Sequence, residues 1–249
     1  MDRPQLKLEM RRMLSSHFPF FLLLFLPVLL LNYGSAIAQY LGNSTGTLYS
    51  TMNDLSVHSY ANVEPIGQFY GLMTIVTVIA IISGLLLIGV RFASIDLIRN
   101  RSTFDEPVTK SFTILNNGQY FIGTLIIGIL ITVLTLLWSL LLIVPGIIKG
   151  FSYSQAFYIY RDAIDQGKPI GYLEAITKSR ELMNGHKWEY FVLYLSFLGW
   201  FILSGFTMGI LDLWVLPYYN LALANFYIKL ADPQPDSLGT IFDDSNHQS

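Results

Sequence analysis

The chain of 249 residues contains no cysteine, and only 13% of its residues are charged. The lack of cysteine excludes a disulfide framework, a thiol nucleophile and a thiolate metal site. A soluble domain of this size carries about a quarter charged residues, so much of the surface of this protein faces something other than water. The net charge of −2 also argues against a nucleic-acid partner, because nucleic-acid-binding proteins carry a basic face.

Long uncharged apolar stretches account for the missing charge, and they predict an all-α polytopic membrane helix bundle. A helix needs about 20 apolar residues to cross the hydrocarbon core. The run from Ser111 to Ile148 has no charge and is too long for one crossing, and Pro145-Gly146 is the expected break because proline interrupts the helical hydrogen bonds. We therefore expect about six transmembrane spans, at residues 18–41, 66–90, 120–144, 147–160, 190–211 and 213–228.

The positions of the basic residues indicate how the spans are oriented, because short cytoplasmic loops collect Lys and Arg. With six spans and an inner N-terminus, 14 of the 15 basic residues fall in inner segments, and Lys149 alone lies near the outer face. If residues 147–160 did not cross, the basic residues would divide almost evenly between the two sides. Six spans with both termini cytoplasmic are therefore preferred.

The chain is expected to form one bundle with two short flanks. Residues 1–17 are a cytoplasmic basic leader, residues 18–230 the bundle, and residues 231–249 an acidic disordered tail with two prolines and four aspartates. The first span has a second interpretation, because a basic leader, an apolar run and Ala36-Ile37-Ala38 also resemble a secretory signal with its cleavage site. An uncleaved first helix is preferred, since the apolar run is long and the remaining chain is itself a membrane bundle.

The loop at residues 169–187 predicts a cytoplasmic amphipathic helix before the fifth span. Apolar residues such as Tyr172 and Ile176 share one helical face, opposite Glu174. Asn184-Gly185 is a suitable C-terminal stop, because both residues tolerate the left-handed conformation. Such a helix is suited to lie at the inner membrane interface.

The runs LLWSLLLIVPGIIKG, KSRELMNGHKW and LSFLGW, in this order, resemble the bacterial domain-of-unknown-function 975 family over about residues 120–230. The resemblance implies a multi-pass protein of a bacterial plasma membrane, and it brings no established activity. A looser likeness is to the membrane portion of some glycerophosphodiester phosphodiesterases, whose catalytic barrel this sequence lacks. The family pattern falls on Trp138, Pro145, Gly146, Tyr153, Ser179, Met183, Gly185, Lys187, Ser196, Gly199, Trp200, Pro217 and Tyr218.

Few residues in this sequence suggest chemistry. The four histidines cannot converge across a bilayer, and no serine lies in a glycine-framed nucleophile elbow, so we expect no metal site, no cofactor and no catalysis. Ionisable residues at membrane depth are the usual signs of transport. The candidates for a functional polar role lie near the interfaces and are Lys149, Glu189 and Asp212.

Two functions agree with these patterns. The first is a non-catalytic membrane scaffold or accessory factor that acts at the cytoplasmic face, because the basic loops and residues 169–187 hold the ordered polar features. The alternative is a small-solute or lipid-handling carrier with a flexible site at Pro145-Gly146 and Lys149. Besides the lipid bilayer, the expected partners are another membrane protein or a second copy of the chain, since pairs such as Gly205/Gly209 permit close helix approach.

Overall fold

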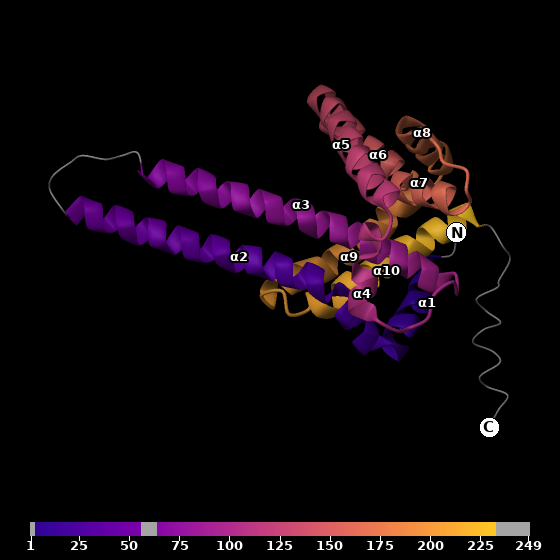
Figure 1. Cartoon of the computed structure of the whole chain (residues 1–249), viewed down its shortest axis with the longest axis horizontal. Helices are drawn as coiled ribbons and strands as arrows, with labels where there is room; N and C mark the ends of the chain where they lie inside the picture. Colours follow the sequence, from indigo (N-terminus) through magenta and orange to yellow (C-terminus); the bar gives the residue numbers. More distant parts are fainter. Residues whose placement is uncertain (1–2, 56–63, 233–249) are drawn as a thin grey trace.

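The computed structural model describes residues 3–55 and 64–232, and in these residues all regular structure is helical (Figure 1). The all-α prediction is therefore confirmed for this part of the chain. The expected acidic tail falls almost wholly on residues 233–249, which lie outside the described residues, as do residues 56–63. In chain order the elements are α1 (Arg3–Ser16), α2 (Phe18–Leu55), α3 (Glu64–Ile98), α4 (Pro107–Ser111), the 3-10 turn η1 (Thr113–Leu115), α5 (Gly118–Leu141), α6 (Ile143–Tyr153), α7 (Ala156–Asp165), α8 (Tyr172–Leu182), α9 (Lys187–Phe206) and α10 (Asp212–Ala231).

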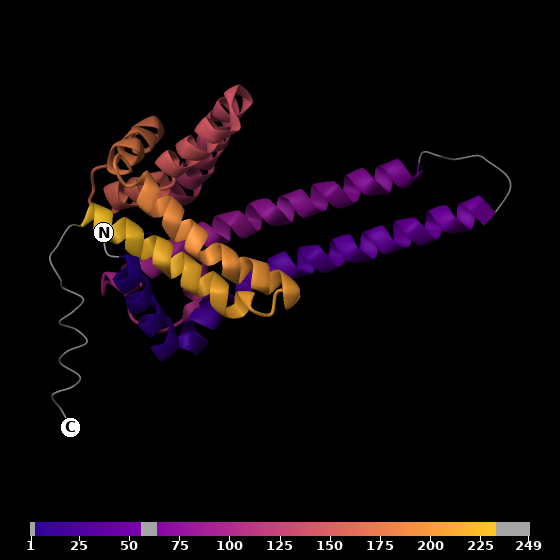
Figure 2. The ribbon, with the colours of Figure 1, turned by 180° about the vertical axis from the view of Figure 1, so that it is seen from behind.

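The long helices form hairpins that start from one end of the molecule (Figures 1 and 2). Helices α2 and α3 make the longest of them. Helix α5 is followed by α6 and α7, which run back along it, and α9 is followed by α10. The α5–α6 pair leans away from α2 and α3, whereas α10 packs against both of them. The short helices α1, α4 and α8 lie at the end where the hairpins start.

Several of these helices have the length and composition of membrane spans. The segments that qualify among the described residues are Phe18–Leu41, Met73–Ile98, Gly118–Leu141 and Lys187–Phe206. They overlap the first, second, third and fifth of the six expected spans, and they indicate a membrane protein. The fourth expected span, residues 147–160, is divided between α6 and α7, and the sixth coincides with α10. Helix α10 is buried along most of its length, and Asn220 and Asn225 are fully buried, so its polar side chains face other helices.

The break in the uncharged run lies at Leu142, before the expected position at Pro145-Gly146. Leu142 has an extended backbone, with φ −159° and ψ 140°, and α6 begins at the next residue. Pro145 therefore occupies the first turn of α6, where the N–H that proline lacks would have no helical acceptor. Gly146 lies where α6 meets α5, because a Cβ at this position would be 2.1 Å from the Oγ of Ser139. Glycine is required here by a close helix contact and not by a turn.

The main core lies where α10 meets α1, α2, α3 and α9. Leu6, Met10 and Leu14 recur at a spacing of four residues on α1, and all three are buried. Burial of each such side chain stabilises the fold by about 1.5–3 kcal/mol. The basic N-terminal segment is thus a helix that packs on the bundle. A second apolar cluster joins α5, α6, α7 and α8, and it contains Ile127, Tyr153, Ala156, Tyr160, Ala175 and Ile176.

Candidate functional site

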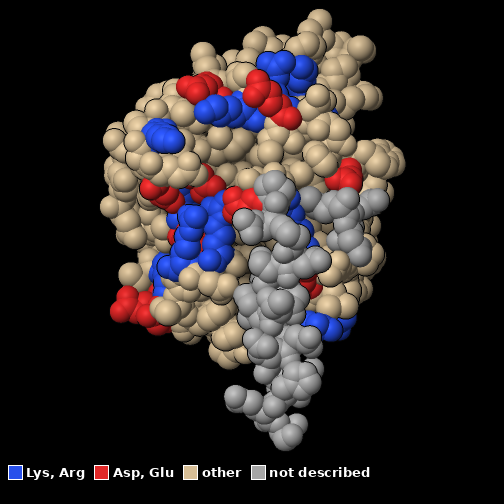
Figure 3. All heavy atoms as spheres, turned by 90° about the vertical axis from the view of Figure 1, so that its right-hand side faces the viewer, with Lys and Arg blue, Asp and Glu red and all other residues tan. Residues whose placement is uncertain are grey.

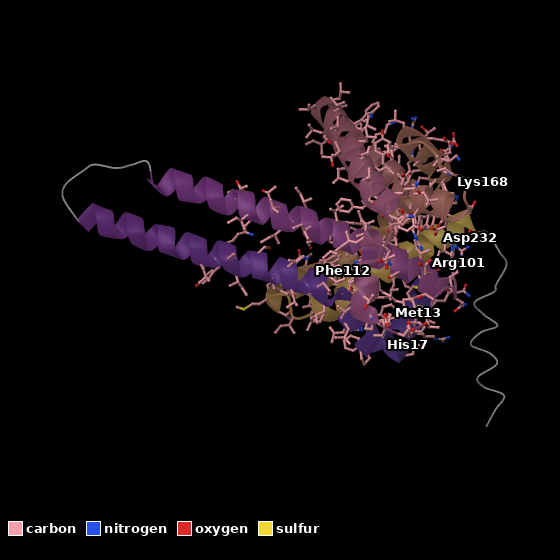
Figure 4. The ribbon with its side chains drawn as sticks, viewed as in Figure 1. Met13, His17, Arg101, Phe112, Lys168 and Asp232 are labelled. Carbon is pink, nitrogen blue, oxygen red and sulfur yellow. The ribbon has the colours of Figure 1, made fainter. Side chains whose placement is uncertain are left out.

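Charged side chains gather at the end of the molecule where the hairpins start (Figure 3). We call this region the charged end; it comprises α1, α4, α7, α8 and the C-terminal parts of α3 and α10. Arg101, Lys168 and Asp232 all lie on it, at the right of Figure 4. Lys149 lies apart from it on α6, where its Nζ is 4.4 Å from the centre of the Trp138 ring.

Arg99 directly follows α3 and connects it to α7 and α10. Its guanidinium lies 2.8 Å from the carboxylate of Asp162 and 2.8 Å from that of Asp232. The hydroxyl of Tyr227 donates a hydrogen bond of 2.7 Å to Asp162. Burial by itself would lower the pKa of Arg99, but the hydrogen bonds and negative charges of the two carboxylates outweigh burial and raise this pKa. The arginine is therefore held in its charged form as a link between three helices.

Arg161 on α7 forms a second link, to α3 and α5. Its Nη2 lies 2.5 Å from Asp96 and 3.4 Å from Asp165, and its Nη1 donates to the carbonyl oxygen of Phe92 at 2.9 Å. Tyr120 near the start of α5 donates a hydrogen bond to Asp165. Removing one partner of such a buried ion pair costs about 3–5 kcal/mol, because it leaves the other charge buried alone. These contacts fix the arrangement of the helices at the charged end.

Arg91 is placed differently from Arg99 and Arg161. It lies within the candidate span Met73–Ile98, and its Nε donates to the side-chain oxygen of Asn220 at 2.7 Å. No carboxylate forms an ion pair with Arg91 in the part of the chain that the structure describes. In the sequence, all three arginines fall among the basic residues of the predicted inner segments. Only a comparison of charges on separate helices could have shown that two of them are neutralised and one is not.

Helix α8 is fixed to the bundle through Ser179. The Ser179 hydroxyl accepts a hydrogen bond from the N–H of Gln155 at 3.2 Å and donates one to the carbonyl of Ser152 at 2.8 Å. These two backbone groups flank the break between α6 and α7. Ala175, Ile176 and Met183 are also buried against the protein, so α8 has one face packed on α5, α6 and α7.

The opposite face of α8 is exposed at the charged end. Leu173 is 62% exposed. Lys178 pairs with Glu174 at 3.0 Å while both stay about half exposed, and Arg180 is also exposed. The helix thus presents a mixed charged surface on a support that the protein itself holds in place.

An open pocket of about 700 Å³ lies at the charged end, beside the start of α5 and the start of α8. The rings of Tyr160 and Tyr172 line it with their centres 5.5 Å apart. Asn117 caps α5 by accepting a hydrogen bond from the N–H of Gln119 at 2.9 Å. The pocket is lined by Asn117, Gly118, Gln119, Ile122, Tyr160, Pro169 and Tyr172.

The residues of the family pattern lie at separate helix contacts and not around one site. Ser196 on α9 accepts a hydrogen bond of 3.0 Å from Lys7 on α1. The rings of Trp200 and Trp214 are 5.6 Å apart between α9 and α10. Tyr218 packs its ring 5.0 Å from that of Phe197.

Other residues of the pattern have local structural roles. Tyr153 and Met183 are buried, and Pro217 is buried within α10. Gly185 has φ 83°, so it ends the segment after α8 in the left-handed conformation that favours glycine, and Lys187 begins α9. An added Cβ at Gly199 would meet no atom within 4 Å.

The structure does not bring the three candidate polar residues together. Glu189 opens α9 and lies 2.8 Å from His186. Asp212 lies at the other end of the α9–α10 hairpin and accepts a hydrogen bond of 2.5 Å from Ser204. Lys149 lies on α6 and contacts Trp138 of α5, within a different hairpin from Glu189 and Asp212.

Residues 140–233 match a family model described as "Protein of unknown function (DUF975)". The match runs from the last turn of α5 through α10, and it contains Ser179, the exposed face of α8 and the carboxylates of Asp162 and Asp232. No curated protein and no solved structure matches the chain. The family resemblance is thus confirmed over these residues, and it assigns no activity to them.

Proposed function

We propose that this chain, whose residues 140–233 match the DUF975 family model of unknown function, is a non-catalytic scaffold or accessory factor of a bacterial plasma membrane. In this proposal it binds another membrane protein through its charged end. The observation that carries the proposal is the exposed charged face of α8, which Ser179 and the buried residues of α8 hold in a fixed position. A fixed, mixed-charge surface suits recognition of a protein.

The proposed topology has six crossings and both termini in the cytoplasm. Helices α6 and α7 have 11 and 10 residues and run back along α5, and α10 has 20 residues beside α9. At about 1.5 Å per residue, each of these returning segments is about 30 Å long, which matches the hydrocarbon core. The basic residues of the charged end favour the cytoplasmic side for it.

The pairing of charges supports a structural role for the charged end over a catalytic one. Arg99 and Arg161 each contact two carboxylates, and these contacts join α3, α7 and α10. Charged groups that form ion pairs with one another within the protein stabilise the arrangement of its helices. What they leave available to a partner is the outer face of α8 and the pocket beside it.

Charge reversal on α8 and at the start of α9 tests the proposal. In the variant Lys178→Glu, Arg180→Glu, Lys187→Glu, we expect the protein to insert normally and to lose its partner in crosslinked affinity purification from native membranes. The control is Arg11→Glu, Arg12→Glu, Arg101→Glu, which changes the net charge equally at exposed positions away from α8. Recovery of the same partner in equal amounts with the α8 variant, or of no stoichiometric protein with the wild type, would contradict the proposal.

A small-solute or lipid-handling carrier is the second candidate, and Arg91 favours it because ionisable residues inside spans often mark binding paths. The site expected at Pro145-Gly146 and Lys149 has little room to move, since Gly146 packs on Ser139 and Lys149 lies over Trp138. We expect Arg91→Gln, and not Lys149→Ala, to reduce anion flux into proteoliposomes if the chain is a carrier. Unchanged flux in Arg91→Gln would reject this candidate.

A further inference from the structure

The pocket beside the starts of α5 and α8 has the size of a small-molecule site and an uncharged lining. Its volume of about 700 Å³ falls in the range of about 300–1,000 Å³ that is usual for such sites. None of the described residues that line it is charged, although charged side chains gather at this end of the molecule (Figure 3). The lining therefore offers no ion pair to a charged ligand, and it suits a neutral polar one.

Two tyrosine rings form an aromatic wall of the pocket, and the fold holds this wall in place. The rings of Tyr160 on α7 and Tyr172 on α8 have their centres 5.5 Å apart. Tyr160 is 8% exposed and packs on the backbone of α5 at Gly123, where an added Cβ would overlap the ring. Tyr172 keeps partial exposure. An aromatic surface of this kind can pack against the apolar C–H groups on the face of a sugar ring.

Amide groups from the start of α5 supply the polar part of the lining. Asn117 accepts a hydrogen bond of 2.9 Å from the N–H of Gln119, which orients its amide and leaves the NH2 group as a donor. Gln119 lines the pocket with an exposed side chain that can both donate and accept. The hydroxyls of a sugar also donate and accept, so they match these amides better than an anion would.

The pocket lies at headgroup depth on a candidate membrane span. Gly118 lines it and is the first residue of the span Gly118–Leu141. Ile122 lines it as well and is 54% exposed. From Ile122 onward, exposed apolar residues recur every three or four positions and so share one face of α5. They are Leu125, Ile129, Val133 and Leu136. An acyl chain can lie along this face while its headgroup occupies the pocket.

We propose that this pocket binds the neutral sugar headgroup of a glycolipid from the membrane leaflet at the charged end. The sugar ring packs on Tyr160 and Tyr172, its hydroxyls bond to Asn117 and Gln119, and the acyl chains lie against the exposed face of α5. The site does not depend on the scaffold function proposed above, because the exposed charged residues of α8 do not line the pocket.

The test uses the full chain, purified in a detergent without a sugar headgroup and freed of lipid. The probe is dioctanoyl glucosylglycerol. It is compared with dioctanoyl glycerol, which lacks the sugar, with dioctanoyl phosphatidylglycerol, whose headgroup is charged, and with methyl glucoside, which lacks acyl chains. Binding is measured by native mass spectrometry and by the ligand-induced shift in Tm. We expect dioctanoyl glucosylglycerol to bind about tenfold or more tightly than each of the other three.

Variants locate the binding in the pocket. Gln119→Ala removes an exposed amide and places a strong helix former in α5, so the protein should fold and bind the glycolipid several-fold more weakly. The matched control, Gln166→Ala, removes an exposed glutamine that does not line the pocket and should leave binding unchanged. Tyr172→Ala should weaken binding more than Tyr172→Phe, because only the first removes the aromatic wall.

Three results would each overturn the proposal. The first is equal binding of dioctanoyl glucosylglycerol and dioctanoyl glycerol, which would mean that the sugar is not recognised. The second is equal binding by the wild type, Gln119→Ala and Tyr172→Ala. The third is binding of methyl glucoside as tight as that of the glycolipid, which would assign the pocket to a free sugar. The variant with Lys178, Arg180 and Lys187 changed to Glu should bind the glycolipid normally, so the scaffold proposal and this one can fail separately.

Discussion

The hydroxyl of Ser179 on α8 accepts a hydrogen bond from the N–H of Gln155, at the break between α6 and α7. The same hydroxyl donates to the carbonyl of Ser152 on the other side of the break. Ser179 and Gln155 are both fully buried, so water cannot replace these bonds. Helix α8 and the segment formed by α6 and α7 are thus joined by one side chain, and the orientation of α8 depends on it.

Replacing Ser179 by Ala is therefore expected to destabilise the protein. The N–H of Gln155 would remain buried without its acceptor, which costs about 1–3 kcal/mol. Thermal unfolding in detergent measures the effect. Thr177→Ala is the control on the same helix, because its hydroxyl is exposed and bonds only to the carbonyl of Leu173 within α8. Equal Tm values for the two variants would show that Ser179 does not hold the break.

Two glycines of α6 make a matched pair for the contact between α5 and α6. An added Cβ at Gly146 would lie 2.1 Å from Ser139 Oγ and 2.9 Å from Ser139 Cα, so the helices would have to separate. A Cβ at Gly150 would meet Thr135 at 3.9 Å, an ordinary contact. We expect Gly146→Ala to cost about 1–3 kcal/mol of stability and Gly150→Ala to be neutral or stabilising. A Gly146→Ala protein as stable as Gly150→Ala would contradict the observed close approach.

Buried and exposed ion pairs on neighbouring helices should differ greatly in their effect on stability. Asp162→Ala removes the carboxylate shared by Arg99 and Tyr227, and we expect a loss of about 3–5 kcal/mol, since Arg99 loses a buried partner. Glu174→Ala breaks the exposed pair with Lys178 and should cost less than about 1 kcal/mol. Chemical denaturation of both variants measures the difference. Similar losses would mean that the Asp162 cluster is not desolvated.

The sequence predicted the features that depend on local pattern. The apolar run at residues 18–41 is a candidate span with the same bounds, and the periodicity in residues 169–187 corresponds to α8 at Tyr172–Leu182. The break between the third and fourth expected spans was predicted at Pro145-Gly146, but it lies at Leu142. Proline is also suited to the first turn of a helix, and glycine to a close contact between helices, so neither residue marks a break by itself.

Features that depend on the meeting of distant segments could not be predicted in this way. Asp96, Asp162 and Asp232 are far apart in the sequence, and their convergence on Arg99 and Arg161 follows from the packing of α3, α7 and α10. Counting basic residues by segment treats a neutralised arginine and an unbalanced one alike. The distinct position of Arg91 therefore became visible only with the fold.

The side of the membrane on which the charged end lies can be measured by cysteine labelling, because the chain contains no cysteine of its own. Ser102→Cys and Thr177→Cys lie at the charged end, and Thr177 is preferred to Ser179 because Ser179 is fully buried and would not react. Met208→Cys lies in the turn between α9 and α10, where Met208 is 92% exposed. With six crossings and a cytoplasmic charged end, a membrane-impermeant maleimide added to intact cells should label Met208→Cys alone. The other two should react only after the membrane is opened. Labelling of Thr177→Cys in intact cells, with Ser102→Cys protected, would instead place α8 outside, and residues 143–165 would then not complete a crossing.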